Sequence, residues 1–258
     1  MEIVDTILKN QASFLFILFR VTAFFFAFPV LGGAGVPNMV KALIVLSMTF
    51  VLFQVLKIEN QIPLTLVSLT AGLIGEVLVG MVIGLGVRLV FGAVEIGSAV
   101  IGMQMGFGTA SLFDPVSNQQ VSLINRFQGL VALLIFFSVN GHHILIRALV
   151  QSFEAVPTMG FYPDGSLISF LMILAGKMFL LGVKISLPII VSLLMANVTI
   201  GILGRVVPQM NVLLFSFPVT IMLGLMALGI SLPFFATLFQ KEISKLEAVF
   251  PLLLKGMQ

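Results

Sequence analysis

The sequence predicts an all-α protein of the hydrophobic, membrane type, and its composition supports this in two ways. Of its 258 residues, 59% are hydrophobic and only 9% are charged, and the mean hydropathy is +1.21. A soluble domain carries roughly 25% charged residues. A chain with so little charge cannot cover its surface as an ordinary soluble enzyme does, and it is too apolar to be disordered.

Composition also narrows the classes of function. The net charge is only +3, and no run of Lys or Arg gives the electrostatic footprint that nucleic-acid binding requires. The chain has no Cys, which excludes disulfide frameworks and thiolate chemistry. It has 25 Phe, one Tyr and no Trp, whereas a typical multi-span protein favours Trp and Tyr at the lipid interface.

Six apolar regions, separated by turn signals, predict the helices. A helix needs roughly 20 apolar residues to cross the hydrocarbon; the fifth region meets this length without a charge, and the sixth could hold two or three helices. The regions cover about residues 12–31, 42–56, 62–94, 96–113, 127–146 and 167–240.

The connections between these regions are rich in Gly and Pro, which free or interrupt the backbone. They include residues 32–37 and 157–165, and residues 207–211 split the last region into a predicted helical hairpin. Pro188, Pro218 and Pro233 are expected to start or kink helices. Residues 240–258 mix Lys and Glu with apolar residues, which predicts an amphipathic tail.

Seven charged side chains lie in or beside the apolar regions. Each would cost roughly 2.5–3.5 kcal/mol if it faced hydrocarbon. Snorkelling to the interface is as good an account as burial for Lys177 and Arg205; the others are expected to face protein. The seven are Arg20, Glu76, Arg88, Glu95, Lys177, Lys184 and Arg205.

Within the third region, small and charged residues recur at intervals of four and predict one inclined ridge on a helix. Its glycines would let another backbone approach closely. One interpretation is packing within the chain, with the charges paired elsewhere in it. The other, which we favour because opposite charges are scarce in the apolar regions, is a seam between subunits. The ridge is Gly72, Glu76, Gly80, Gly84, Arg88 and Gly92, and the seam would also include Glu95.

A Gly-rich apolar segment follows the fourth region's Met-containing stretch. At membrane depth, such a loop is tolerated only where it is buried in protein or lines a cavity. Bulky apolar residues on a backbone with Gly hinges could obstruct a conduit, or could simply connect two helices, and the residues alone do not decide. The segment is Gly106, Phe107, Gly108, Thr109, Ala110, Ser111, Leu112, Phe113, Asp114 and Pro115.

The sequence carries no motif for catalysis. The zinc-protease, nucleophile-elbow and phosphate-loop signatures are all missing. His142 and His143 are adjacent, so on a helix they point about 100° apart and would not share one metal ion. We therefore predict that the protein is not an enzyme and uses no cofactor or metal.

Four collinear stretches carry a family resemblance over nearly the whole chain. They are residues 20–46 (RVTAFFFAFPVLGGAGVPNMVKALIVL), 101–115 (IGMQMGFGTASLFDP), 140–143 (NGHH) and 197–211 (NVTIGILGRVVPQMN). Together they resemble the FliR family of flagellar export-gate subunits, which is shared in homologous form with virulence-type secretion systems.

The resemblance implies a fold and a role. The chain would be one subunit with a FliP-like part over about residues 1–165 and a FliQ-like hairpin with its tail over about residues 166–258. It would assemble with FliP, FliQ and FlhB into a closed export gate for unfolded proteins, in the inner membrane within the flagellar basal body. The segment 106–115 would be the plug of that gate, with Phe107, Leu112 and Phe113 as its bulky members.

Two other classes of function are alternatives to this one. A small secondary transporter would use the intramembrane charges as ion or proton sites around a midplane site. Transporters often have related halves with matching breaks, and none is visible here. The other alternative is an inert membrane scaffold. Solute transport by the solitary chain would favour the transporter, and an obligate hetero-oligomer would favour the gate.

Overall fold

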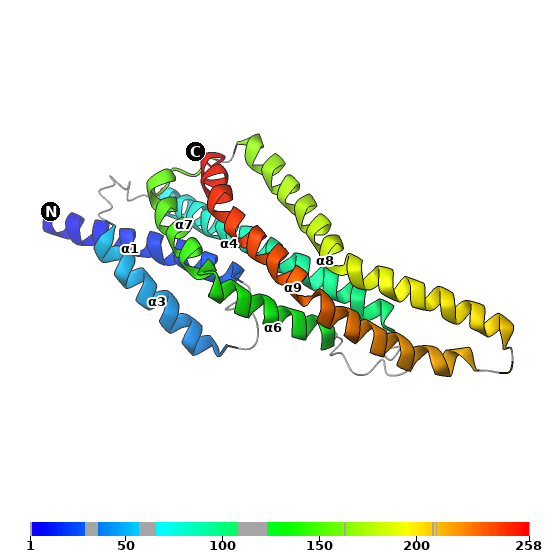
Figure 1. Ribbon diagram of the computed structural model, residues 1–258. Helices are drawn as coiled ribbons and strands as arrows, with labels where there is room; N and C mark the ends of the chain where they lie inside the picture. Colours follow the sequence, from blue (N-terminus) through cyan, green and yellow to red (C-terminus); the bar gives the residue numbers. More distant parts are fainter. Residues whose placement is uncertain are drawn as a thin grey trace. The chain divides into compact units, whose positions relative to one another are not determined.

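The described part of the protein is all-helical, as predicted. The computed structural model describes residues 2–28, 36–56, 66–107, 123–162, 164–207, 209 and 211–257, and these residues contain no strand. Figure 1 shows the course of the chain through the helices of these ranges. They are α1 (Glu2–Ala27), α3 (Asn38–Val55), α4 (Leu66–Gln104), α6 (Leu123–Ser138), α7 (Gly141–Ala155), α8 (Gly165–Val206) and α9 (Val212–Lys255).

Helix α4 joins two regions that the sequence analysis had separated. Residues 62–94 and 96–113 were expected as two elements, but Leu66–Gln104 is one helix of 39 residues. Neither Glu95 nor Gly97 interrupts it. The Glu95 side chain is exposed on the helix surface, and a Cβ at Gly97 would lie 2.8 Å from the carbonyl oxygen of Gly182. The glycine therefore serves a close helix–helix contact rather than a break.

The fifth predicted region is interrupted instead of continuous. We expected residues 127–146 to form one uncharged helix, but α6 ends at Ser138 and α7 begins at Gly141. Asn140 stands between them in the left-handed conformation, with φ 56°. Asn tolerates this conformation better than most residues. The uncharged composition of this region predicted one continuous helix. The Asn140-Gly141 pair allows the backbone to break within it.

The last region forms two long helices joined where the sequence predicted a turn. Helix α8 ends at Val206 and α9 begins at Val212, and Pro188 lies inside α8. The predicted tail is the C-terminal end of α9. There, Ile243, Leu246 and Phe250 are buried while Lys245 is exposed, so the predicted amphipathic pattern is confirmed.

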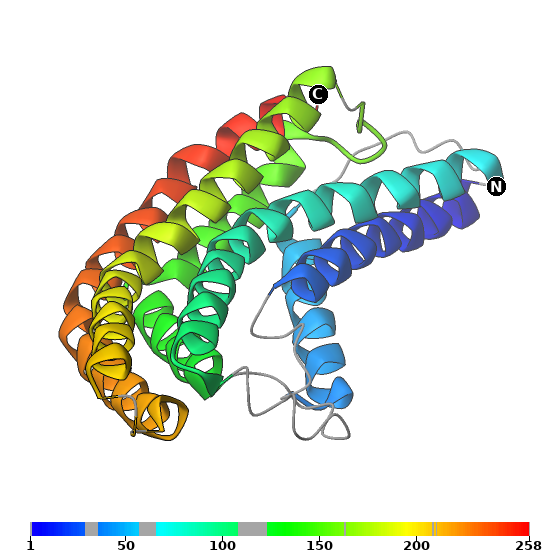
Figure 2. The ribbon, with the colours of Figure 1, turned by 90° about the vertical axis from the view of Figure 1, so that its right-hand side faces the viewer.

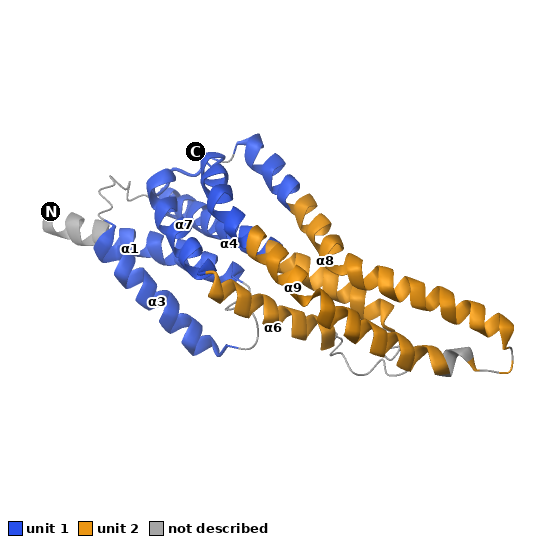
Figure 3. Ribbon diagram, in the orientation of Figure 1, with its two compact units in different colours: residues 1–89, 140–174, 243–258 blue, residues 90–139, 175–242 orange. Residues whose placement is uncertain are grey.

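The chain divides into two compact units, shown in Figure 3. Unit 1 contains residues 1–89, 140–174 and 243–258, and unit 2 contains residues 90–139 and 175–242. Helices α4, α8 and α9 each supply residues to both units, so the boundaries do not coincide with a break near residue 165. The likeness of residues 1–165 and 166–258 to FliP and FliQ is a separate matter and stays a prediction.

Each unit has its own apolar core. In unit 1, α1 and α4 lie side by side (Figure 2), and Ala12 and Phe16 are buried against Leu69, Leu73 and Met159. In unit 2, helices α4, α6, α8 and α9 contribute to one cluster of six buried residues: Ile101, Met105, Ile124, Ile189, Leu193 and Leu228.

Four helices among the described residues are long and apolar enough to cross a membrane. They are α3, α4, α8 and the part of α9 from Phe215 to Lys255, and α6 with α7 would make a fifth span if the pair counts as one. Helix α3 is the least covered, with Thr49 and Leu52 as its buried residues. So much uncovered apolar surface needs lipid or other protein around it.

Candidate functional site

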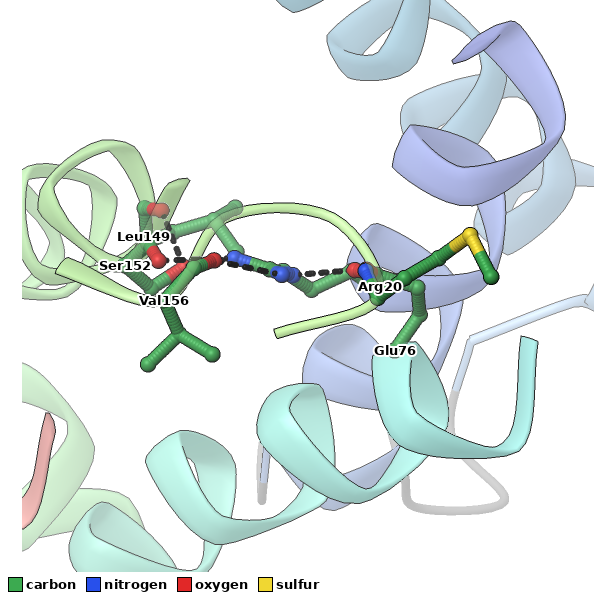
Figure 4. A network of polar contacts seen from close by, with 6 residues as sticks. Arg20, Glu76, Leu149, Ser152 and Val156 are labelled. Carbon is green, nitrogen blue, oxygen red and sulfur yellow. Dashed lines mark hydrogen bonds and ion pairs between the residues drawn. The ribbon is translucent and has the colours of Figure 1, made fainter. Parts of the chain in front are cut away.

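A buried ion pair joins α1 to α4 in unit 1. The Arg20 Nε donates to Oε2 of Glu76 (Figure 4), and the two side chains are 0% and 2% exposed. The other carboxylate oxygen, Oε1 of Glu76, accepts from the backbone N–H of Met159 at 3.4 Å. Because neither charge faces water, burying the two side chains carries a desolvation cost. Their mutual attraction and their hydrogen bonds offset this cost.

The same guanidinium caps the C-terminal end of α7. Its Nη1 donates to the carbonyl oxygen of Ser152 at 2.7 Å and its Nη2 to that of Val156 at 2.9 Å (Figure 4). The last carbonyls of a helix have no partner within the helix and carry its partial negative charge, so a cation is favourable there. The guanidinium carbon also lies 4.2 Å from the centre of the Phe153 ring, a cation–π geometry. Arg20 therefore connects three helices.

Glycines on the ridge allow the close approach that brings Arg20 to Glu76. A Cβ at Gly80 would overlap the carbonyl oxygen of Arg20 and lie 3.0 Å from the Cβ of Ala23. At Gly84 it would lie 2.9 Å from the carbonyl oxygen of Phe24. These neighbours are backbone and short side-chain atoms that cannot move aside, so only glycine fits at these positions of the α1–α4 contact.

The remaining ridge positions divide into covered and exposed ones. Gly72 lies against Phe16 and Met159, and Gly92 lies against Met178 of α8. Arg88 and Glu95, by contrast, are exposed. Packing within the chain accounts for the glycines and Glu76. The seam between subunits stays a prediction, for which Arg88 and Glu95 are the accessible charges.

The sequence predicts that Arg20 and Glu76 face protein but does not predict that they pair. The two are separated by 56 positions, and no local spacing rule connects residues so far apart. The available signal was indirect: a ridge of small residues predicts one close helix neighbour, and Arg20 is the cation of the N-terminal apolar region.

Only the beginning of the predicted plug segment is described by the structure. Gly106 follows the end of α4 with φ +90°, in the left-handed region that favours glycine. Phe107 packs against the apolar cluster of unit 2. The other plug residues, 108–115, lie outside the described residues.

Two of the exposed charges of α8 lie on one face. Lys177 and Lys184 are both exposed, and a spacing of seven places them on the same side of a helix. Exposed neighbours such as Val183 and Leu187 are apolar. An ammonium group surrounded by apolar surface requires water, a headgroup or an acidic partner within reach.

Comparison with known proteins identifies the class of protein that this helical, membrane-type fold represents. The family model of bacterial export proteins, family 1, matches residues 11–246. The chain therefore belongs to this family of bacterial export proteins.

Three relatives of the chain are flagellar biosynthetic proteins. It is 31% identical to flagellar biosynthetic protein FliR of Pectobacterium carotovorum subsp. carotovorum over 222 residues, 86% of this chain and 85% of the relative. It is 30% identical to FliR of Aquifex aeolicus over 220 residues, 83% of each chain. It is likewise 30% identical to FliR of Escherichia coli K12 over 230 residues, 89% of this chain and 87% of the relative. The resemblance found in the sequence is thus confirmed.

Proposed function

We propose that the chain is a non-enzymatic subunit of the flagellar type III export gate, assembling with FliP and FliQ, and with FlhB, around a path for unfolded proteins. The observation that carries the proposal is the family match over residues 11–246. Its setting would be the bacterial inner membrane within the flagellar basal body.

The uncovered surface of the chain supports assembly with other subunits. Arg88, Glu95 and Lys184 are exposed on helices whose residues are mostly apolar. Charged groups facing lipid would each cost roughly 2.5–3.5 kcal/mol. Neighbouring subunits that bring opposite charges would remove this cost and fix the register of the assembly.

Purification of the full chain with its co-expressed FliP and FliQ, followed by native mass determination, tests the assembly. We expect one complex that contains all three proteins, with none of the chain present as a separate species in the purified sample. A chain that stays folded and monodisperse by itself in lipid nanodiscs, and transports a small solute there, would contradict the proposal and support the transporter.

The plug role of residues 106–115 is part of the same proposal. Deletion of residues 110–113 within the complex shortens the segment and leaves Gly106 and Phe107 in place. If the segment obstructs the path, the complex still assembles but conducts small ions across a planar bilayer. Conductance equal to that of the unaltered complex would argue against the plug and would leave the assembly proposal intact.

A further inference from the structure

The C-terminal end of α4 packs against one face of α9, within unit 2. Three residues of α9 form this face: Phe217, Thr220 and Gly224. Their spacings of three and four place them on the same side of the helix. Each of them lies against Met105 or Gly106, the two residues that follow α4 and precede the segment predicted to be the plug.

Gly224 lies so close to the Met105 side chain that a Cβ at this position would force that side chain to shift. A Cβ there would lie 2.6 Å from Cγ of Met105 and 2.9 Å from its Sδ. Met105 is completely buried in the cluster that α6, α8 and α9 share with α4. The thioether therefore fits against bare helix backbone on one side and a packed core on the other, and it cannot shift without opening a void.

The other two residues contact the backbone beside Met105. The Phe217 ring lies 3.0 Å from the position that a Cβ would take at Gly106, where φ is +90°. Thr220 is only 5% exposed, and its hydroxyl lies 3.4 Å from the carbonyl oxygen of Met105, 3.0 Å from that of Ser216 and 3.1 Å from that of Phe217. Its single proton is within reach of two carbonyls of α9 and, at the longest distance, of the Met105 carbonyl, which follows the end of α4.

We propose that Phe217, Thr220 and Gly224 form a positioning site, the α9 clamp, that sets where α4 ends and couples that point to the α8–α9 hairpin. A displacement of α9 then displaces Met105 and Gly106 with it. The coupling to conductance rests on the proposed function, because it requires the segment after Phe107 to act as the plug. The positioning itself does not.

The experiment compares two alanine substitutions in the same helix. Gly224→Ala adds a methyl group against Met105, whereas Gly229→Ala adds one where nothing lies within 4 Å. Spin labels on Met103→Cys and Met222→Cys report the distance between the end of α4 and α9. Both positions are exposed, and the chain has no cysteine of its own; the partners in the complex are made cysteine-free. We expect Gly224→Ala to shift or broaden this distance and Gly229→Ala to leave it unchanged.

A second-site change separates the clamp from general damage to the fold. Met105→Ala removes the side chain that the new methyl group meets, so Gly224→Ala with Met105→Ala should regain the distance of the unaltered complex. No shift with Gly224→Ala, or no recovery in the double variant, would overturn the clamp.

Conductance of the same complexes tests the coupling. We expect a several-fold rise with Gly224→Ala and none with Gly229→Ala. If the distance shifts and conductance does not, while deletion of residues 110–113 does raise conductance, the plug role stands and the coupling is overturned. If neither change raises conductance, the plug role itself fails and the clamp remains as a structural contact.

Discussion

Arg20 and Glu76 form an ion pair that lies entirely inside unit 1, with side chains 0% and 2% exposed. The pair joins α1 to α4, and the guanidinium extends the connection to the end of α7 through Ser152 and Val156. Removing one member would leave the other charge buried without its partner, which is more costly than replacing both.

Arg20→Ala should therefore destabilise the protein by about 3–5 kcal/mol, measured as the shift of its unfolding transition in detergent. Arg147→Ala is the matched control, because Arg147 pairs with Glu247 while both side chains are more than half exposed, and such a pair contributes about 0–1 kcal/mol. Replacing both buried members, Arg20→Met with Glu76→Leu, should cost less than Arg20→Ala alone. Equal losses for Arg20→Ala and Arg147→Ala would contradict the assigned role.

Gly80→Ala should destabilise unit 1 by about 1–3 kcal/mol, because the added methyl group meets backbone that cannot yield. The nearest atoms are the carbonyl oxygen of Arg20 and the amide nitrogen of Phe24. Gly176→Ala in α8 is the control, since nothing lies within 4 Å of that position, and alanine there should raise helix stability. The measurement is the unfolding transition of each variant compared with that of the unaltered chain. An unchanged transition for Gly80→Ala would disprove the close α1–α4 contact.

Arg88→Ala should weaken assembly with partner subunits without lowering the stability of the solitary chain. Its side chain is exposed, so the chain loses no packed core when it is truncated. Glu76→Ala should do the opposite and lower the stability of the chain itself, because that carboxylate is buried. Yield of the co-purified complex and the unfolding transition of the chain are the two measurements. An undiminished yield with Arg88→Ala would remove this residue from the predicted seam.

Asn140→Val should destabilise the connection between α6 and α7 by roughly 1–2 kcal/mol, because a β-branched residue is strained at positive φ. The observed φ of Asn140 is 56°. Asn140→Gly should be tolerated, since glycine adopts this conformation readily. The difference between the unfolding transitions of these two variants measures the cost of placing a β-branched residue in the left-handed conformation. Equal transitions would show that residue 140 does not keep this conformation.

Periodicity and composition predicted the helices well, and the contacts between them poorly. The scarcity of charge identifies the membrane-type class, and the residues at 207–211 mark the turn between α8 and α9. Residues 62–94 and 96–113, the second range rich in Gly, were predicted as two elements where α4 is one helix, because local composition does not distinguish a glycine that ends a helix from one that lets a second helix approach. That distinction depends on the neighbour, such as Gly182 beside Gly97.

The candidate site shows the same limit. The ridge from Gly72 to Gly92 correctly marked a surface of close approach, and covered glycines are what the structure shows. The sequence does not predict which helices pack against this surface, because α1 and α7 contact α4 through residues that lie far away in the sequence. The clamp on Met105 was missed for the same reason: Gly224 is one of 24 glycines, and nothing nearby in the sequence marks it.

The composition of unit 1 has a consequence for how the chain is made. Its core includes Ile243, Leu246, Phe250 and Leu253, which are synthesised more than 150 residues after the first helices of the same unit. Those helices must therefore wait with part of their interior uncovered until residues 243–253 have been made. Any factor that shields nascent membrane segments would act in that interval, and a stop codon before Ile243 would leave the earliest-made portion without this part of its core.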